Sequence, residues 1–132
     1  MRSFRSSGVD VLVCLLTDDE LAELDLTDEA QCCQLSGMEF VRFPIPDRAV
    51  PADEAAFTLL VESLCEHLNA GRGVAIHCRQ GIGRSALLAA RVLCAMGDSP
   101  AFAFERIIAA RGWPVPDTVE QREWVIRTVS RS

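Results

Sequence analysis

The residues best suited to chemistry form one run, His77-Cys78-Arg79-Gln80-Gly81-Ile82-Gly83-Arg84-Ser85. The run follows a short apolar segment, Gly73 to Ile76, that predicts a buried strand, and it precedes residues 86–93, which predict a helix that is apolar on nearly every side. A strand that passes through a glycine-containing turn into a helix directs several backbone N–H groups at one point, with the positive end of the helix dipole behind them. Residues 78–84, here called the anion loop, are therefore predicted to bind an oxyanion such as phosphate.

A cysteine and an arginine in the anion loop are spaced to act on a bound anion. The thiolate is the nucleophilic form of cysteine, and Cys78 has both influences that favour it, a helix N-terminus and a nearby cation. Arg84 lies six positions later, so the five residues between can surround a tetrahedral anion. The planar guanidinium of Arg84 can bind two oxygens of that anion at once. We expect Ser85 to donate a hydrogen bond to the departing sulfur, and His77 to anchor the turn rather than to act as a base. The alternative is an inert, buried structural cysteine at a helix start.

This run resembles the His-Cys-x5-Arg-Ser/Thr signature of the cysteine-based protein tyrosine phosphatases, and the chain as a whole is similar to a small, atypical dual-specificity phosphatase. The resemblance implies hydrolysis of phosphate monoesters through a cysteinyl-phosphate, with phosphotyrosine as the first substrate and phosphoserine and phosphothreonine left open. It implies no cofactor and no metal. The predicted substrate-binding residues are Arg79, Gln80, Gly81, Ile82, Gly83 and Arg84.

A proline-rich segment supplies the general acid that the resemblance implies. Residues 38–43 alternate like a strand, and residues 44–51, here called the acid loop, contain three prolines that prevent regular structure and stiffen the backbone. Asp47 lies in the centre of this loop, at the Pro-Asp position where these phosphatases carry the acid that protonates the leaving group. The alternative is a turn residue that hydrogen-bonds its own backbone, a common role for aspartate beside proline.

A second proline-containing turn, residues 114–117, precedes the last predicted helix. The resemblance places Gln121 where related phosphatases carry a glutamine that orients the hydrolytic water. A solvent-facing helix glutamine explains the residue equally well, so both interpretations remain open at this point.

Length and charge limit the kind of protein. The 132 residues are expected to form a single domain, residues 1–132, with a real core, since 49% of the chain is apolar. The net charge of -6 disfavours nucleic acid and anionic membranes as partners, and no apolar run is long enough to span a bilayer. A phosphorylated protein or a small phosphate monoester is the expected partner of a monomeric, cytoplasmic protein.

The six cysteines support a reducing compartment, because their spacing matches no zinc pattern and five of them lie in apolar segments predicted to be strands or helices. They are Cys14, Cys32, Cys33, Cys65, Cys78 and Cys94. The vicinal Cys32 and Cys33 are interpreted as a half-buried helix face, with a redox pair that guards Cys78 as the less favoured alternative.

Strand and helix patterns alternate along the chain and predict an α/β fold with a parallel-dominated central sheet flanked by helices on both faces. The strands are predicted at 9–16, 38–43 and 73–76. The helices are predicted at 18–24, 28–36, 53–69, 86–93, 101–110 and 118–129. The carboxyl ends of parallel strands meet at one edge of the sheet, so the anion loop and the acid loop are expected to lie together there. Related domains carry one more strand before residue 9, so we expect either a smaller sheet or a missing N-terminal strand.

Two other functions fit parts of the pattern. A rhodanese-like sulfurtransferase also presents a cysteine in a cradle of N–H groups, but it needs neither the Arg-Ser end of the loop nor an acid loop. A non-catalytic phosphoprotein-binding module would be favoured by loss of Cys78 or Asp47, and the chain has both.

Overall fold

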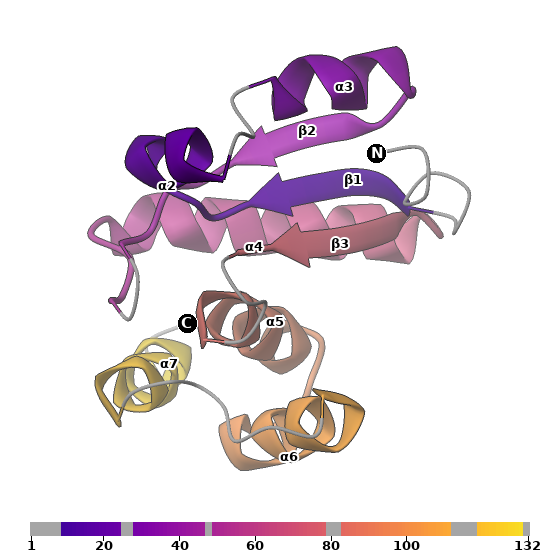
Figure 1. Ribbon diagram of the computed structural model, residues 1–132. Helices are drawn as coiled ribbons and strands as arrows, with labels where there is room; N and C mark the ends of the chain where they lie inside the picture. The colour runs from indigo at the N-terminus through magenta and orange to yellow at the C-terminus, as the bar shows by residue number, and fades with distance from the viewer. Residues whose placement is uncertain (1–8, 25–27, 47–48, 79–82, 112–118, 131–132) are drawn as a thin grey trace.

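The computed structural model describes residues 9–24, 28–46, 49–78, 83–111 and 119–130. Three parallel strands form its sheet: β1 (Val9–Cys14), β2 (Glu39–Arg42) and β3 (Gly73–His77), in the order β2-β1-β3. Cys14 at the end of β1 is in register with Arg42 on one side and His77 on the other. All three strands therefore end at one edge of the sheet (Figure 1).

The described residues also form six helices. They are α2 (Asp18–Glu23), α3 (Glu29–Leu35), α4 (Glu54–Asn69), α5 (Gly83–Ala95), α6 (Pro100–Arg111) and α7 (Val119–Ser130). Side-chain caps begin several of them, as the sequence predicts. Thr17 and Glu20 form a capping box at α2, Asp53 accepts from the Ala56 N–H at the start of α4, and Ser99 accepts from the Phe102 N–H at α6.

Helices cover both faces of the sheet, which confirms the predicted α/β fold class. On one face Leu12 of β1 packs with Cys33 of α3 and Met38. On the other face Val11 and Val13 pack into a larger core with residues of α4 and α5. Central parallel strands are buried on both sides, which is why residues 11–16 form one continuous apolar run.

Helices α5, α6 and α7 pack together beside the edge strand β3 (Figure 1). Their shared core includes Phe104 of α6 and Trp124 of α7, both almost fully buried. The ring of Trp124 meets Phe57 of α4 at 5.2 Å between centroids, and Phe57 meets Phe43 at 5.4 Å. This aromatic series joins α7 through α4 to the residue that precedes the acid loop.

The element bounds differ from the predicted ones mainly at the carboxyl edge of the sheet. The first strand ends at Cys14 rather than at residue 16, because Leu15 leaves β1 to make two cross-links. Its N–H donates to the His77 carbonyl at 2.9 Å, and its carbonyl accepts from the Ile45 N–H at 2.9 Å. The helix predicted at 86–93 begins earlier, at Gly83, so Arg84 and Ser85 lie in its first turn. None of the helices in the described ranges is long and apolar enough to cross a membrane.

Candidate active site

The candidate site lies at the carboxyl edge of the sheet, where β3 ends and α5 begins. Cys78 follows His77, the last residue of β3, and is buried. The His77 carbonyl is tied to the Leu15 N–H, which fixes the end of the strand beside β1. Residues 79–82, which contain four of the predicted substrate-binding positions, lie outside the described residues. The two other predicted substrate-binding residues, Gly83 and Arg84, are described and begin α5.

The sulfur of Cys78 and the hydroxyl of Ser85 lie together in this turn. Cys78 Sγ is 2.8 Å from Ser85 Oγ, and either atom can be the donor. Ser85 is fully buried and Cys78 is 5% exposed, so the pair is largely shielded from solvent. A hydroxyl at this distance donates to the sulfur when the sulfur is a thiolate, and this contact is the one that the spacing of the two residues predicts.

Arg84 is buried at the start of α5, and a carboxylate balances its charge. Its Nη1 donates to Glu20 Oε1 at 2.6 Å, and its Nη2 donates to Glu20 Oε2 at 2.8 Å. Nη1 also donates to the carbonyl of Ile45, at the start of the acid loop, at 2.8 Å. The side chain is 1% exposed. Arg84 therefore joins α5 to α2 and to the acid loop.

Glu20 is a site residue that the sequence analysis missed. Its carboxylate accepts from the backbone N–H of Thr17 at 3.1 Å, which satisfies the capping box, and at the same time it holds Arg84. The hydrogen bond from Arg84 is the main reason that the pKa of Glu20 falls from 4.5 to about 2, against the opposing effect of burial. The spacing of Thr17 and Glu20 is typical of a capping box, which explains the glutamate locally, so the pattern predicts no distant partner for it. The available signal was its place just after β1, at the edge where the anion loop was expected.

The acid loop is held on both sides of its predicted catalytic residue. The Ile45 N–H donates to the Leu15 carbonyl, and the Ala49 N–H donates to the Pro46 carbonyl at 3.0 Å. The second bond joins the two described residues that flank positions 47 and 48 in the sequence. Asp47 itself lies outside the described residues, so its role as the general acid stays a prediction.

Gln121 lies on α7 and is fully buried, so its interpretation as a solvent-facing helix residue is wrong. Its Nε2 donates to the Ala49 carbonyl at 2.8 Å. The side chain therefore contacts the backbone of the acid loop at Ala49, which also bonds to Pro46. The structure brings Gln121 to the acid loop, and its predicted role with the hydrolytic water stays a prediction.

The vicinal cysteines belong to the other side of the sheet. Cys33 is fully buried against Leu12 and Met38, and Cys32 is partly exposed, which fits the half-buried helix face predicted for them. Cys78 belongs to the core on the opposite face.

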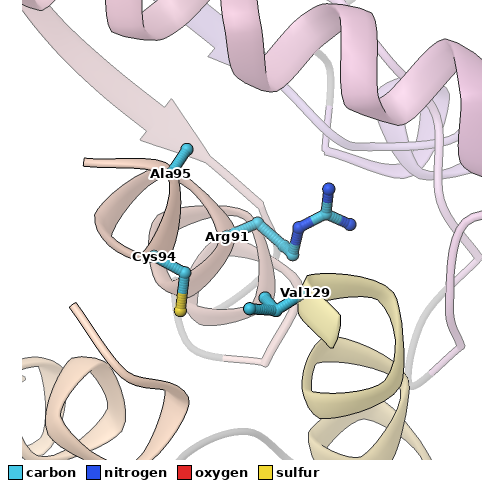
Figure 2. Close-up of a pocket in the computed structure, with 4 residues that line it drawn as sticks. All are labelled: Arg91, Cys94, Ala95 and Val129. Atoms are coloured by element: carbon cyan, nitrogen blue, oxygen red, sulfur yellow. The ribbon is translucent and has the colours of Figure 1, made fainter. Parts of the chain in front are cut away.

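A cavity of about 350 Å³ lies away from this site and is lined by Arg91, Cys94 and Ala95 of α5 and Val129 of α7. Figure 2 shows that the guanidinium of Arg91 points away from the sulfur of Cys94. Arg91 Nη1 donates to the Thr128 hydroxyl at 2.8 Å, and Nη2 donates to the Thr58 hydroxyl at 3.4 Å. These contacts link α5 to α7 and α4.

Comparisons with known proteins agree with this geometry. Residues 1–98 match the family described as the DSP-PTPase phosphatase of polymorphic toxin systems. The rat cyclin-dependent kinase inhibitor 3 is 30% identical over 123 residues, which cover 92% of this chain and 58% of the relative. The human protein of the same name is 29% identical over the same shares. The chain thus spans less than two thirds of the length of these curated relatives.

Solved structures share the fold. A crystal structure of kinase associated phosphatase, with its catalytic-site cysteine replaced by serine, has a TM-score of 0.89 at 26% identity and covers 97% of this chain and 72% of its own. The active form of Tk-PTP has a TM-score of 0.80 at 26% identity and covers 99% of this chain and 85% of its own. A cysteine, serine and buried arginine at one strand-to-helix turn thus occur within a phosphatase fold. The chain belongs to the DSP-PTPase phosphatase family.

Proposed function

We propose that this chain hydrolyses phosphate monoesters through a covalent intermediate on Cys78. The observation that carries the proposal is the 2.8 Å contact between Cys78 Sγ and Ser85 Oγ, a residue of the first turn of α5, which also contains the buried Arg84. A sulfur with a hydroxyl donor and a cation beside a helix N-terminus is suited to attack a bound anion.

The reaction has two steps. The Cys78 thiolate attacks phosphorus, the bond from phosphorus to the leaving oxygen breaks, and Asp47 gives that oxygen its proton. Water then attacks phosphorus while Asp47 accepts a proton from it, the P–S bond breaks, and inorganic phosphate leaves with the thiolate restored. Ser85 donates to the sulfur as it departs.

Arg84 and the backbone N–H groups of residues 79–83 hold the phosphoryl oxygens, because positioning and charge stabilisation supply most of the catalysis in phosphoryl transfer. Nη1 of Arg84 donates to Glu20 and to the Ile45 carbonyl, and Nη2 donates to Glu20. The Glu20 carboxylate keeps the plane of the fork in place before the substrate arrives.

A phosphorylated protein is the proposed substrate, with phosphotyrosine first and phosphoserine or phosphothreonine second. Support comes from the similarity to kinase associated phosphatase and to cyclin-dependent kinase inhibitor 3. Small aryl phosphates serve as convenient probes of the same chemistry.

The first test measures phosphate release from para-nitrophenyl phosphate and from phosphotyrosine, phosphoserine and phosphothreonine peptides. Cys78→Ser is expected to abolish turnover and keep affinity for a phosphate analogue, whereas the matched Cys65→Ser is expected to stay active. Acid quenching during turnover should trap a phosphate adduct on Cys78, detectable by mass spectrometry. Sulfur transfer from thiosulfate to cyanide, or peptide binding without turnover by the unmodified protein, would overturn the proposal.

The second test isolates the acid. Asp47→Asn should slow phenyl phosphate, a poor leaving group, by about 10²-fold or more, since general acid catalysis contributes on the order of 10²–10⁴. Substrates with good leaving groups need little protonation and should change much less. An equal loss on both substrates would remove Asp47 from its role.

A further inference from the structure

The described parts of the acid loop are fastened to two helices through their backbone, at Ile45 and at Ala49. On one side Arg84 of α5 donates to the Ile45 carbonyl at 2.8 Å. On the other side Gln121 of α7 donates to the Ala49 carbonyl at 2.8 Å. Between these points the Ala49 N–H donates to the Pro46 carbonyl at 3.0 Å. The two clamps thus flank the position of the acid rather than the sulfur.

The Gln121 clamp rests on a rigid support. Gln121 is fully buried, and Trp124 and Val125, in the next turn of α7, are buried in the main core. Trp124 contacts Phe57, and Phe57 contacts Phe43 just before the acid loop. Helix α7 therefore contacts the acid loop directly at Ala49, and Phe57 of α4 connects it to Phe43, the residue that precedes the loop. Loss of the donor would leave the half-buried Ala49 carbonyl without this partner, which favours a shift of the loop backbone at Ala49.

We propose that Gln121 is a positioning residue for proton transfer: it fixes the backbone of the acid loop at Ala49 so that Asp47 reaches the leaving oxygen. This inference rests on the proposed function, and it differs from the role of orienting the hydrolytic water. Its physical basis is that a misplacement of about 1 Å at a reacting group can cost on the order of 10²-fold in rate.

The two roles of Gln121 affect different kinetic constants. The value of kcat/KM includes only steps up to formation of the cysteinyl-phosphate, whereas kcat also includes its hydrolysis. A defect in proton delivery to the leaving group lowers kcat/KM, and it does so most for poor leaving groups. A defect in water orientation leaves kcat/KM unchanged, lowers kcat and makes the phosphoenzyme accumulate as a burst.

The test variant is Gln121→Met, which keeps the length of the side chain and removes the donor. The matched control is Gln34→Met, the same change at an exposed position of α3. For Gln121→Met we expect kcat/KM to fall about tenfold or more for phenyl phosphate and less than about threefold for 2,4-dinitrophenyl phosphate. No new burst should appear. The loss of kcat/KM should depend on the leaving group as it does in Asp47→Asn, but it should be smaller. The control should match the unmodified protein on both substrates.

An unchanged kcat/KM with a lower kcat and a new burst would overturn the inference in favour of water orientation. An equal loss on both aryl phosphates would overturn it in favour of a purely structural role. If Gln121→Met shows no cooperative unfolding transition, Gln121→Glu carries the same test, because it keeps the length and presents an acceptor to the Ala49 carbonyl. All these outcomes require an active unmodified protein, so they are distinct from a failure of the proposed function, which would leave no turnover at all.

Discussion

Two buried arginines, Arg84 and Arg91, lie two helical turns apart on α5 and have different hydrogen-bond partners. Arg84 is 1% exposed, and a bidentate contact with Glu20 balances its charge. Arg91 is 3% exposed, and its guanidinium meets two hydroxyls and lies 5.7 Å and 5.5 Å from the rings of Phe57 and Trp124.

The difference separates a site residue from a scaffold residue. Burial lowers the pKa of Arg91, whose hydroxyl and ring contacts partly replace lost hydration. At Arg84 the carboxylate fixes the orientation of the fork at the edge where Cys78 lies. We expect Arg84, held at the edge where Cys78 lies, to serve a substrate, whereas Arg91, which contacts hydroxyls and rings near the charge of Glu54, joins α5 to α4 and α7.

The largest expected effect is on activity, at Arg84. Arg84→Lys should lower kcat/KM for aryl phosphates by about 10²–10³-fold, because a lysine cannot make the bidentate contacts of the guanidinium. Arg91→Lys is the paired change. It should keep kcat/KM within about threefold while lowering the free energy of unfolding by about 1–3 kcal/mol, since it loses the ring contacts and a hydroxyl bond. Urea unfolding and steady-state kinetics measure both, and equal activity losses in the two variants would erase the distinction.

A smaller effect is expected when the counterion of Arg84 is neutralised. Glu20→Gln should lower the free energy of unfolding by about 3 kcal/mol and kcat/KM by about tenfold, because it leaves a buried charge less well balanced. Asp19→Asn, an exposed neighbour on α2, is the control and should change neither. Unfolding at neutral pH measures the first quantity, and a stability equal to that of the control would show that the pair is not needed for folding.

The same carboxylate makes stability depend on pH. The pKa of Glu20 falls from 4.5 to about 2 in the folded chain, so its contribution is complete above its ordinary value and is lost as the pH falls through the folded one. The unmodified protein should therefore lose stability more steeply between about pH 5 and pH 2 than Glu20→Gln. Thermal unfolding midpoints measured across this range compare the slopes, and parallel slopes would contradict the assignment.

The smallest effects are expected at the hydroxyls around Arg91. Thr128→Val should cost about 1–2 kcal/mol, because Thr128 Oγ1 lies 2.8 Å from Arg91 and is buried. Thr58→Val, which removes the longer 3.4 Å contact, should cost less. Activity should be unchanged in both variants. A larger loss at Thr58 would reverse the order of the two contacts.

Most of the fold was predictable because its signals are local. The alternating strand and helix patterns, the capping box at Thr17 and the cap at Ser99 each depend on residues a few positions apart. The pairing of Cys78 with Ser85 was also within reach, because the two residues belong to one strand-turn-helix unit. The first strand was predicted two residues too long, since apolar Leu15 and Leu16 continue its pattern while the backbone of Leu15 turns to bond β3 and the acid loop.

The sequence alone thus predicted most of the elements and the segment between β3 and α5 whose residues are expected to act on a phosphate. Only the tertiary structure decided that Glu20 holds Arg84 from 64 residues away and that Gln121 holds Ala49 from 72 residues away. Periodicity and capping depend on neighbours along the chain. Glu20 is explained locally as a capping residue and Gln121 as a helix residue, so neither pattern predicts a distant partner. Their distant partners depend on the strand order β2-β1-β3 and on the packing of α7, which bring separate segments to one edge of the sheet.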